Sequence, residues 1–299
     1  MSDESVCALC DEKKILRNSH IIPDLVFRYL KASSPTGHMR NMSEPNLRAP
    51  GGLAVPLLCE DCEARFQKYE DKFARKFFHP IHSEGKRPPY CYSDWMMKFG
   101  ISVVWRIGIY LLQQDGKLML EEHSAERDVI DRTLSVWKSF LRDEITNPGF
   151  NRLHMVVFDH AIDTTEPLPV NFNRFMARAV KLDYAVGGRQ SLIVAKMCRV
   201  HLFGIVRDES PADWRNTRVS SGDGLVDVGE VRMPGGLLPY FISKATEVGQ
   251  SYSGISDKQK KKIASDIEKR RHKTKGNESF SALAADIDMF GLDEVAKFE

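Results

Sequence analysis

Two Cys-x-x-Cys pairs constrain the folding of this chain more than any other feature of its sequence. The first pair is Cys7 with Cys10, and the second is Cys59 with Cys62. Each pair forms a tight turn in which both sulfurs reach the same ion, and four such thiolates complete a tetrahedral zinc site. The alternative, four unrelated buried thiols, leaves this double spacing to chance. We therefore expect one structural zinc ion bound by these four cysteines, with no open position for water.

The overall composition is that of a globular protein in a reducing compartment. The chain has 299 residues, of which 42% are hydrophobic, and its net charge of +2 favours no class of partner. The first residues, MSDESVCALCDEKK, contain no apolar segment of the kind that a secretory signal needs. Six cysteines without such a signal favour metal binding over disulfides. We therefore expect a cytoplasmic protein.

The longest apolar stretch is FGISVVWRIGIYLL, from Phe99 to Leu112, and it contains Arg106. A membrane-spanning helix needs about 20 apolar residues, which is more than this stretch provides. The stretch therefore predicts a helix in the protein core, and we expect no membrane association.

The order of the sequence patterns predicts an α+β fold in two parts. We expect a zinc-binding module at residues 1–88 and a mixed α/β domain at residues 89–299, because the Pro88-Pro89 pair follows the last helical segment of the module. Residues 33–52 are rich in Ser, Pro, Gly and Asn and predict a long irregular loop. Apolar periodicity and β-branched runs predict helices at 60–78, 94–112, 121–145 and 171–180, a strand at 153–158, and one bent strand or a close hairpin at 192–206.

The C-terminal part of the chain separates its charges into two blocks. Residues 251–275 contain nine Lys or Arg and three acids, whereas residues 276–299 contain six acids and one Lys. The basic block predicts a helix from about Ser256 that binds a nucleic-acid backbone, with a solvated surface helix as the alternative. The acidic block has apolar residues at helical spacing and predicts a packed helix. The residues expected to contact nucleic acid are Lys260, Lys261, Lys262, Arg270 and Arg271.

Between the two cysteine pairs lies the segment Ser19-His20-Ile21-Ile22-Pro23, and Gly51-Gly52 precedes the second pair. This order resembles the HNH (His-Me finger) endonucleases that carry a structural zinc, over residues 7–80 of the chain. The resemblance implies a treble-clef, ββα-metal-like fold for the module and metal-dependent hydrolysis of nucleic-acid phosphodiesters. It also implies that His20 is the general base and that Glu63 occupies the position of a catalytic-metal ligand.

The chain departs from the pattern of that family at three positions. Ser19 stands where Asp or His usually binds the catalytic metal, and Ala54 stands where an Asn is usual. Glu63 replaces a His, but its carboxylate suits a hard ion such as Mg or Mn. Glu70 shares a helical face with Glu63 and is a candidate second carboxylate for this metal, with a solvated helix face as the alternative. Further candidates after the same helix are His79 and His82, with loop histidines of no catalytic role as the alternative.

Two functions follow from these patterns. The first is an HNH-like endonuclease that uses His20 and a Mg or Mn ion to cut nucleic acid, DNA in preference to RNA. The second is a zinc-stapled scaffold that binds nucleic acid or a protein partner without cutting. The intact His-x-x-Pro segment and the basic block favour the first function, whereas Ser19 and Ala54 favour the second.

Overall fold

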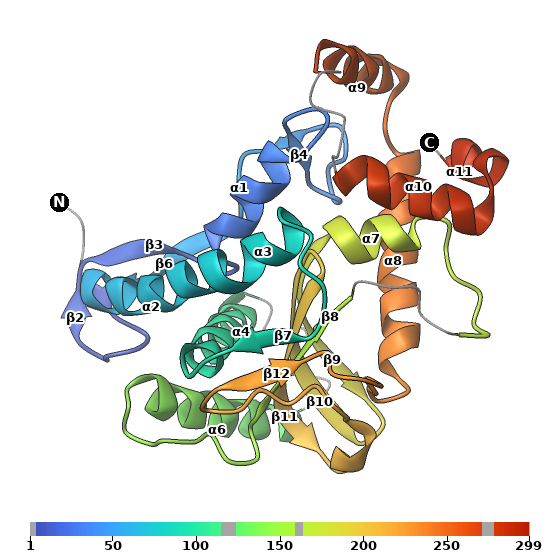
Figure 1. The fold of residues 1–299 in the computed structure, drawn as a ribbon. Coiled ribbons are helices and arrows are strands. Elements are labelled where there is room, and N and C mark those ends of the chain that lie inside the picture. The colour runs from blue at the N-terminus through green and yellow to red at the C-terminus, as the bar shows by residue number, and fades with distance from the viewer. Residues whose placement is uncertain (1–3, 115–123, 159–163, 271–277, 299) are drawn as a thin grey trace.

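The computed structural model describes residues 4–114, 124–158, 164–270 and 278–298. Its N-terminal quarter consists of two hairpins followed by a long helical segment (Figure 1). The first hairpin pairs β1 (Ser5–Val6) with β2 (Lys13–Lys14), and the second pairs β3 (Leu16–His20) with β6 (Ala54–Cys59). Helix α2 (Glu60–Phe73) follows β6 directly and continues through a π-helical turn, η1 (Ala74–Phe78), into α3 (His79–His82).

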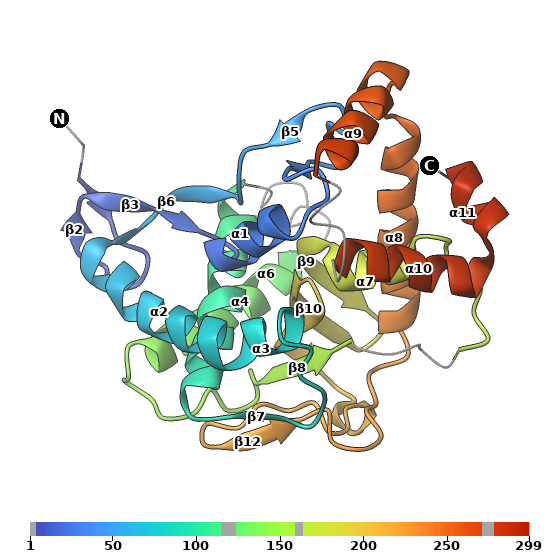
Figure 2. The ribbon, with the colours of Figure 1, turned by 45° about the horizontal axis from the view of Figure 1, so that its top comes forward.

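The connection from β3 to β6 contains the helix α1 (Asp24–Ala32) and the predicted loop of residues 33–52. Most of this loop is irregular, as the sequence predicts. It also contains a short hairpin of β4 (Met39–Arg40) and β5 (Arg48–Ala49), which Figure 2 shows beside the C-terminal part of the chain.

A four-stranded antiparallel sheet forms the second part of the fold. Its strand order is β8 (Leu153–Val157), β11 (Val200–Asp208), β10 (Gln190–Met197) and β9 (Val180–Gly187). The segment 192–206 is therefore a close hairpin, and it turns at Cys198, which has a positive φ of 56°. Near the sheet, β7 (Tyr90–Tyr92) pairs with β12 (Gly224–Val226), and a 3-10 turn, η2 (Pro211–Asp213), precedes β12.

Helices cover both faces of this sheet, because its strands are apolar on both sides. On β10, Ile193 and Ala195 belong to one hydrophobic cluster, whereas Leu192 and Val194 belong to another. The first cluster includes α4 (Trp95–Gln114) and α6 (Ser124–Leu141), and the second includes α7 (Phe172–Arg178) and α8 (Leu237–Ser253), as Figure 1 shows. Alternate residues of each strand thus face opposite layers of helices.

Helix α4 lies at the centre of the molecule, between α2 and the sheet (Figure 2). By length and composition it is apolar enough to cross a membrane, but most of it is buried inside the protein. Its Phe99 ring stacks on Phe73 of α2 at a centroid distance of 3.9 Å. One hydrophobic cluster extends from Leu9, in the turn that carries the first cysteine pair, to Val226. The two predicted parts of the chain therefore share one core across residue 88.

The charged C-terminal blocks form the three helices α9 (Asp257–Lys269), α10 (Glu278–Phe290) and α11 (Leu292–Phe298). The predicted start of α9 is confirmed, because the Ser256 hydroxyl accepts a hydrogen bond from the Gln259 amide. Helix α10 packs on α7 as a helix of the folded protein, as its sequence predicts. Its fully buried Asp286 accepts hydrogen bonds from the Asn173 amide and from Arg174 Nε, which fixes α10 to the first turn of α7.

Gly204 of β11 lies where the sheet packs closely against α4 and α6. A Cβ at this position would lie 2.6 Å from the Trp137 ring and 2.8 Å from Val104. Gly204→Ala should therefore lower the free energy of unfolding by about 1–3 kcal/mol, because the core has no room for a methyl group. Gly187→Ala in β9 is the matched control, since a Cβ at Gly187 has no neighbour within 4 Å. Urea unfolding measures both, and equal stability of the two variants would contradict this account of the packing.

Candidate metal centre and histidine site

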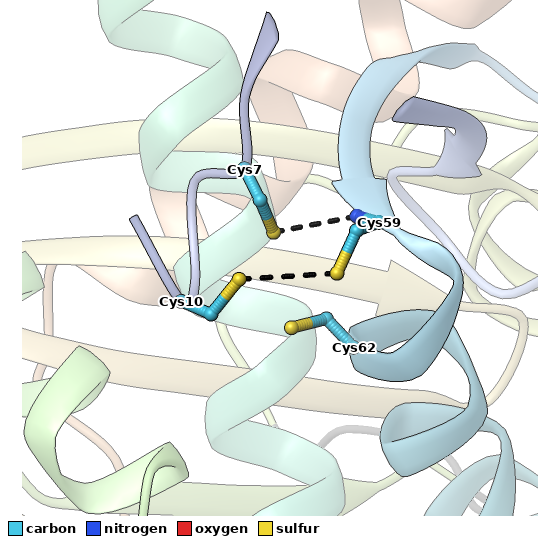
Figure 3. A group of neighbouring side chains, drawn as sticks. All are labelled: Cys7, Cys10, Cys59 and Cys62. Carbon is cyan, nitrogen blue, oxygen red and sulfur yellow. Dashed lines mark hydrogen bonds between the residues drawn. The ribbon is translucent and has the colours of Figure 1, made fainter. Parts of the chain in front are cut away.

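The four predicted zinc ligands lie together in the structure (Figure 3). The sulfurs of Cys7, Cys10, Cys59 and Cys62 all lie within 4.8 Å of one another, and those of Cys10 and Cys59 are 3.8 Å apart. In a tetrahedral site with Zn–S bonds of about 2.3 Å, neighbouring sulfurs are about 3.8 Å apart. The cluster therefore has the donor set of a structural zinc site and a spacing compatible with a bound metal ion.

Local backbone structure brings the two pairs together. Cys7 and Cys10 occupy the turn between β1 and β2, where Asp11 has a positive φ of 64°. Cys59 ends β6, and Cys62 lies in the first turn of α2. The Ala8 amide donates to the Leu57 carbonyl at 3.1 Å, which joins the turn to β6. The strand-to-helix junction and the turn thus present their sulfurs to one point.

The electrostatics of the cluster favour a bound cation. Burial acts to raise the pKa of the Cys7 thiol, but hydrogen bonds from the amides of Cys10, Cys59 and Leu9 outweigh it and lower this pKa to about 7. Burial raises the pKa of Cys62, and its neighbouring thiols raise it further. Burial also raises the pKa of Cys10. One thiolate therefore forms readily, whereas a full set of thiolates needs a compensating positive charge.

His20 lies at the end of β3, where it pairs with Ala54 of β6. Its imidazole is partly exposed, and Nε2 lies 3.7 Å from Oδ1 of Asp24, four residues later in α1. Its carbonyl accepts a hydrogen bond of 2.7 Å from Arg106 Nη1 of α4. The His20 side chain is therefore accessible to solvent, while its backbone carbonyl is hydrogen-bonded to a residue of the protein interior.

Glu63 lies in the first turn of α2, directly after Cys62, the last cysteine of the cluster. Its Oε1 is buried and accepts no hydrogen bond from the described part of the chain. A buried acceptor without a donor is costly, so this carboxylate oxygen is open to a water molecule or a bound cation. Within the described residues, however, only the cysteine cluster brings three or more such donor atoms together. His20 and Glu63 therefore do not form a complete metal site by themselves.

Two other residues considered for the catalytic-metal site, Ser19 and Glu70, form polar contacts within the protein. Ser19 is fully buried, and its hydroxyl accepts a hydrogen bond from the Leu58 amide at 3.1 Å. Glu70 is nearly buried, and its Oε1 lies 2.7 Å from Arg106 Nη2. In this structure Ser19 therefore stabilises the β3–β6 hairpin, and Glu70 balances the charge of a buried arginine.

His82 is part of the protein core. Its Nδ1 lies 2.9 Å from the Phe78 carbonyl, and its Nε2 accepts a hydrogen bond from the Arg199 amide at 3.3 Å. Its ring stacks on that of Phe78 at a centroid distance of 4.1 Å. Burial lowers the pKa of His82 from 6.5 to about 3. His82 is thus a neutral core histidine.

The basic helix α9 docks on the loop of residues 33–52 through polar contacts. The Asn46 side chain donates to the Gly254 carbonyl and accepts from the Ser256 amide, both at 2.9 Å. Arg48 forms an ion pair of 2.9 Å with Asp266 of α9. The predicted contact residues Lys260, Lys261 and Lys262 are exposed, Arg270 is partly buried against Gly37, and Arg271 lies outside the described residues.

The structure adds two residues that the sequence prediction did not assign to the site, Asp24 and Arg106. Asp24 was detectable in principle, because four residues separate it from His20 across a helix start. Arg106 was visible as the single charge in an apolar stretch, but its contacts are not a property of the sequence. Comparisons of the chain with protein-family models, with curated proteins and with solved structures found no match.

Purified protein should contain one zinc ion per chain, and Cys59→Ser should abolish zinc retention. Loss of the ion should lower the unfolding temperature strongly, because structural zinc contributes on the order of 10 kcal/mol to the unit that it holds. Elemental analysis and calorimetry measure the two effects. Cys91→Ser is the control, since Cys91 is exposed and lies outside the cluster. Folded wild-type protein without metal would disprove the zinc site.

Acid should destabilise the protein through His82. Its folded-state pKa is depressed, so the unfolded state binds the proton more readily, and stability falls as the pH drops from 6.5 towards 3. The His82 contribution lost by pH 5 is about 2 kcal/mol. His82→Gln should therefore lose less stability than wild type between pH 7.5 and pH 5 in urea unfolding. The comparison cancels effects common to both proteins, such as proton competition at the cysteines, and parallel losses would refute this role.

Proposed function

We propose that this protein is an HNH-like, metal-dependent endonuclease on a zinc-stapled treble clef. The observation that carries the proposal is the orphaned carboxylate oxygen of Glu63, at the position where the resemblance expects a metal ligand. The order of turn, hairpin and helix around the cysteine cluster is consistent with a treble clef. His20 ends a strand of that hairpin with a solvent-accessible ring.

His20 is suited to remove a proton from water. A neutral imidazole accepts a proton near physiological pH, and a positioned base of this kind contributes about 10²–10⁴-fold to a rate. Asp24 lies 3.7 Å from Nε2, where its negative charge stabilises the imidazolium that forms. The other ring nitrogen, Nδ1, would then accept the proton from the water molecule.

Glu63 would hold the catalytic Mg or Mn, since carboxylate oxygen suits a hard ion. Such an ion stabilises the negative charge of the phosphate and of the leaving oxygen. Ser19 does not supplement Glu63, because its hydroxyl is engaged by the Leu58 amide. The protein alone thus offers few ligands, and we expect metal binding in the millimolar range, completed by substrate phosphate and water.

DNA is the proposed substrate, and the exposed lysines of α9 are the proposed backbone contacts. None of Lys260, Lys261 and Lys262 forms an ion pair within the described part of the chain. Free lysines on one helix attract phosphate without reading sequence. Asn46 and Arg48 fix this helix to the loop that leads back to β6 and His20.

A second candidate function is a scaffold that binds nucleic acid without cutting it. The engagement of Ser19 by β6 and the absence of a complete three-ligand site at His20 among the described residues favour it. Zinc would then stabilise a binding surface only.

Nicking of supercoiled plasmid in the presence of Mg or Mn separates the two functions. Wild type should nick the plasmid, and EDTA should stop the reaction. His20→Ala and Glu63→Gln should each lower the rate by about 10²-fold or more, with zinc content and unfolding temperature unchanged. Wild type that binds DNA but never cuts it, with either metal, would establish the scaffold function instead.

Replacing Lys260, Lys261 and Lys262 together with Gln should weaken DNA binding and flatten its salt dependence. Each lost phosphate contact should reduce the slope of log K against log[salt] by about 0.9. Fluorescence anisotropy at several salt concentrations measures this slope. The control replaces Lys76 and Lys86, which are exposed lysines far from α9 in the chain. An unchanged slope in the triple variant would show that α9 only faces solvent.

A further inference from the structure

We propose that Arg106 is a positioning residue for the candidate active site, an inference that rests on the proposed function. Arg106 lies on α4 and touches neither solvent nor the region where substrate would bind, because it is only 1% exposed. It connects the backbone of His20 to α2, the helix that carries Glu63. One buried side chain thus links the two elements that bear the candidate catalytic groups.

The guanidinium of Arg106 uses each of its three nitrogens. Nη1 donates to the His20 carbonyl at 2.7 Å, and Nη2 donates to Glu70 Oε1 at 2.7 Å. Nε donates to the Ser102 carbonyl within α4 at 3.2 Å. The planar, rigid fork of arginine holds all three acceptors in fixed relative positions, which a lysine cannot do.

The energetic cost of this arrangement argues for a positioning role. Moving a charge into the protein interior costs several kcal/mol, and an ion pair repays that cost only with good geometry and complete hydrogen bonding. A well-packed apolar side chain of similar volume often serves the stability of a fold equally well. In addition, the hydrogen bonds of Arg106 connect α4 to β3 and to α2 in a fixed geometry, which an apolar side chain cannot do.

The link between β3 and α2 matters at the candidate site because β3 carries His20 and α2 carries Glu63. The His20 carbonyl lies at the last residue of β3, where strands tend to fray. Glu70 and Glu63 are seven residues apart, two turns along the same face of α2. Arg106 holds the His20 carbonyl against α2, the helix that carries Glu63. It therefore fixes the distance between the candidate base, His20, and the candidate metal ligand, Glu63. A misplacement of about 1 Å can cost about 10²-fold in rate.

The first test measures cleavage of a fluorogenic DNA oligonucleotide by Arg106→Met, Arg106→Lys and Glu70→Gln. We expect kcat to fall about 10- to 100-fold with KM changed less than threefold and zinc retained. Lysine should rescue little, since it lacks the fork. Arg152→Met is the control, because Arg152 forms a largely buried ion pair with Asp208 at the end of the sheet, at 3.0 Å and away from the candidate site. Equal loss of kcat in the control would reduce Arg106 to a purely structural role and overturn the inference.

The second test does not depend on cleavage. Mn²⁺ added to wild type should broaden the NMR signals of the His20 ring, and Arg106→Met and Glu70→Gln should weaken this broadening. Glu70→Gln preserves volume and tests the same link if Arg106→Met fails to fold. No broadening in wild type would overturn the proposed metal site and this inference with it. Full broadening and full kcat in Glu70→Gln and Arg106→Lys would overturn the positioning role alone.

Discussion

Helix α4 is apolar on nearly all sides, so it is stable in water only if other elements cover it completely. The sheet covers one side, α6 another, and α2 a third. This requirement joins the N-terminal cysteine module to the rest of the chain, because α2 belongs to that module. Burial of α4 therefore explains why one hydrophobic cluster crosses the boundary that the sequence suggests at residue 88.

The same burial explains the chemistry beside His20. A charged residue on a fully covered helix must find partners inside the protein, and Arg106 finds them in the His20 carbonyl and in Glu70. Glu70 cannot serve this arginine and also be a free metal ligand. Because Glu70 is paired with Arg106, Glu63, whose Oε1 is unpaired, is the carboxylate available on that face of α2.

The cysteine cluster lies at the N-terminal end of α2, whereas α4 packs along the rest of that helix. Without a cation, burial and neighbouring thiols oppose ionisation of Cys62, so the cluster favours a metal electrostatically as well as geometrically. A metal ion there would fix the end of β6 to the first turn of α2. Zinc and α4 would then together determine where Glu63 stands relative to the end of β3.

The sequence by itself determined the cysteine cluster and several of the helices and strands of this protein. Cysteine spacing predicted the cluster, because a Cys-x-x-Cys turn is a local structure. Apolar periodicity predicted α4 and α7, a β-branched run predicted β8, and the basic block predicted the start of α9. For β10 and β11 the sequence allowed either one bent strand or a hairpin, and the structure shows the hairpin. Only the tertiary structure decided the state of individual polar groups. Whether Ser19 faces a ligand or the Leu58 amide, whether Glu70 is free or paired with Arg106, and whether His82 is a base or a core residue depends on contacts between segments far apart in sequence. Such contacts are set by packing, which local sequence patterns do not encode.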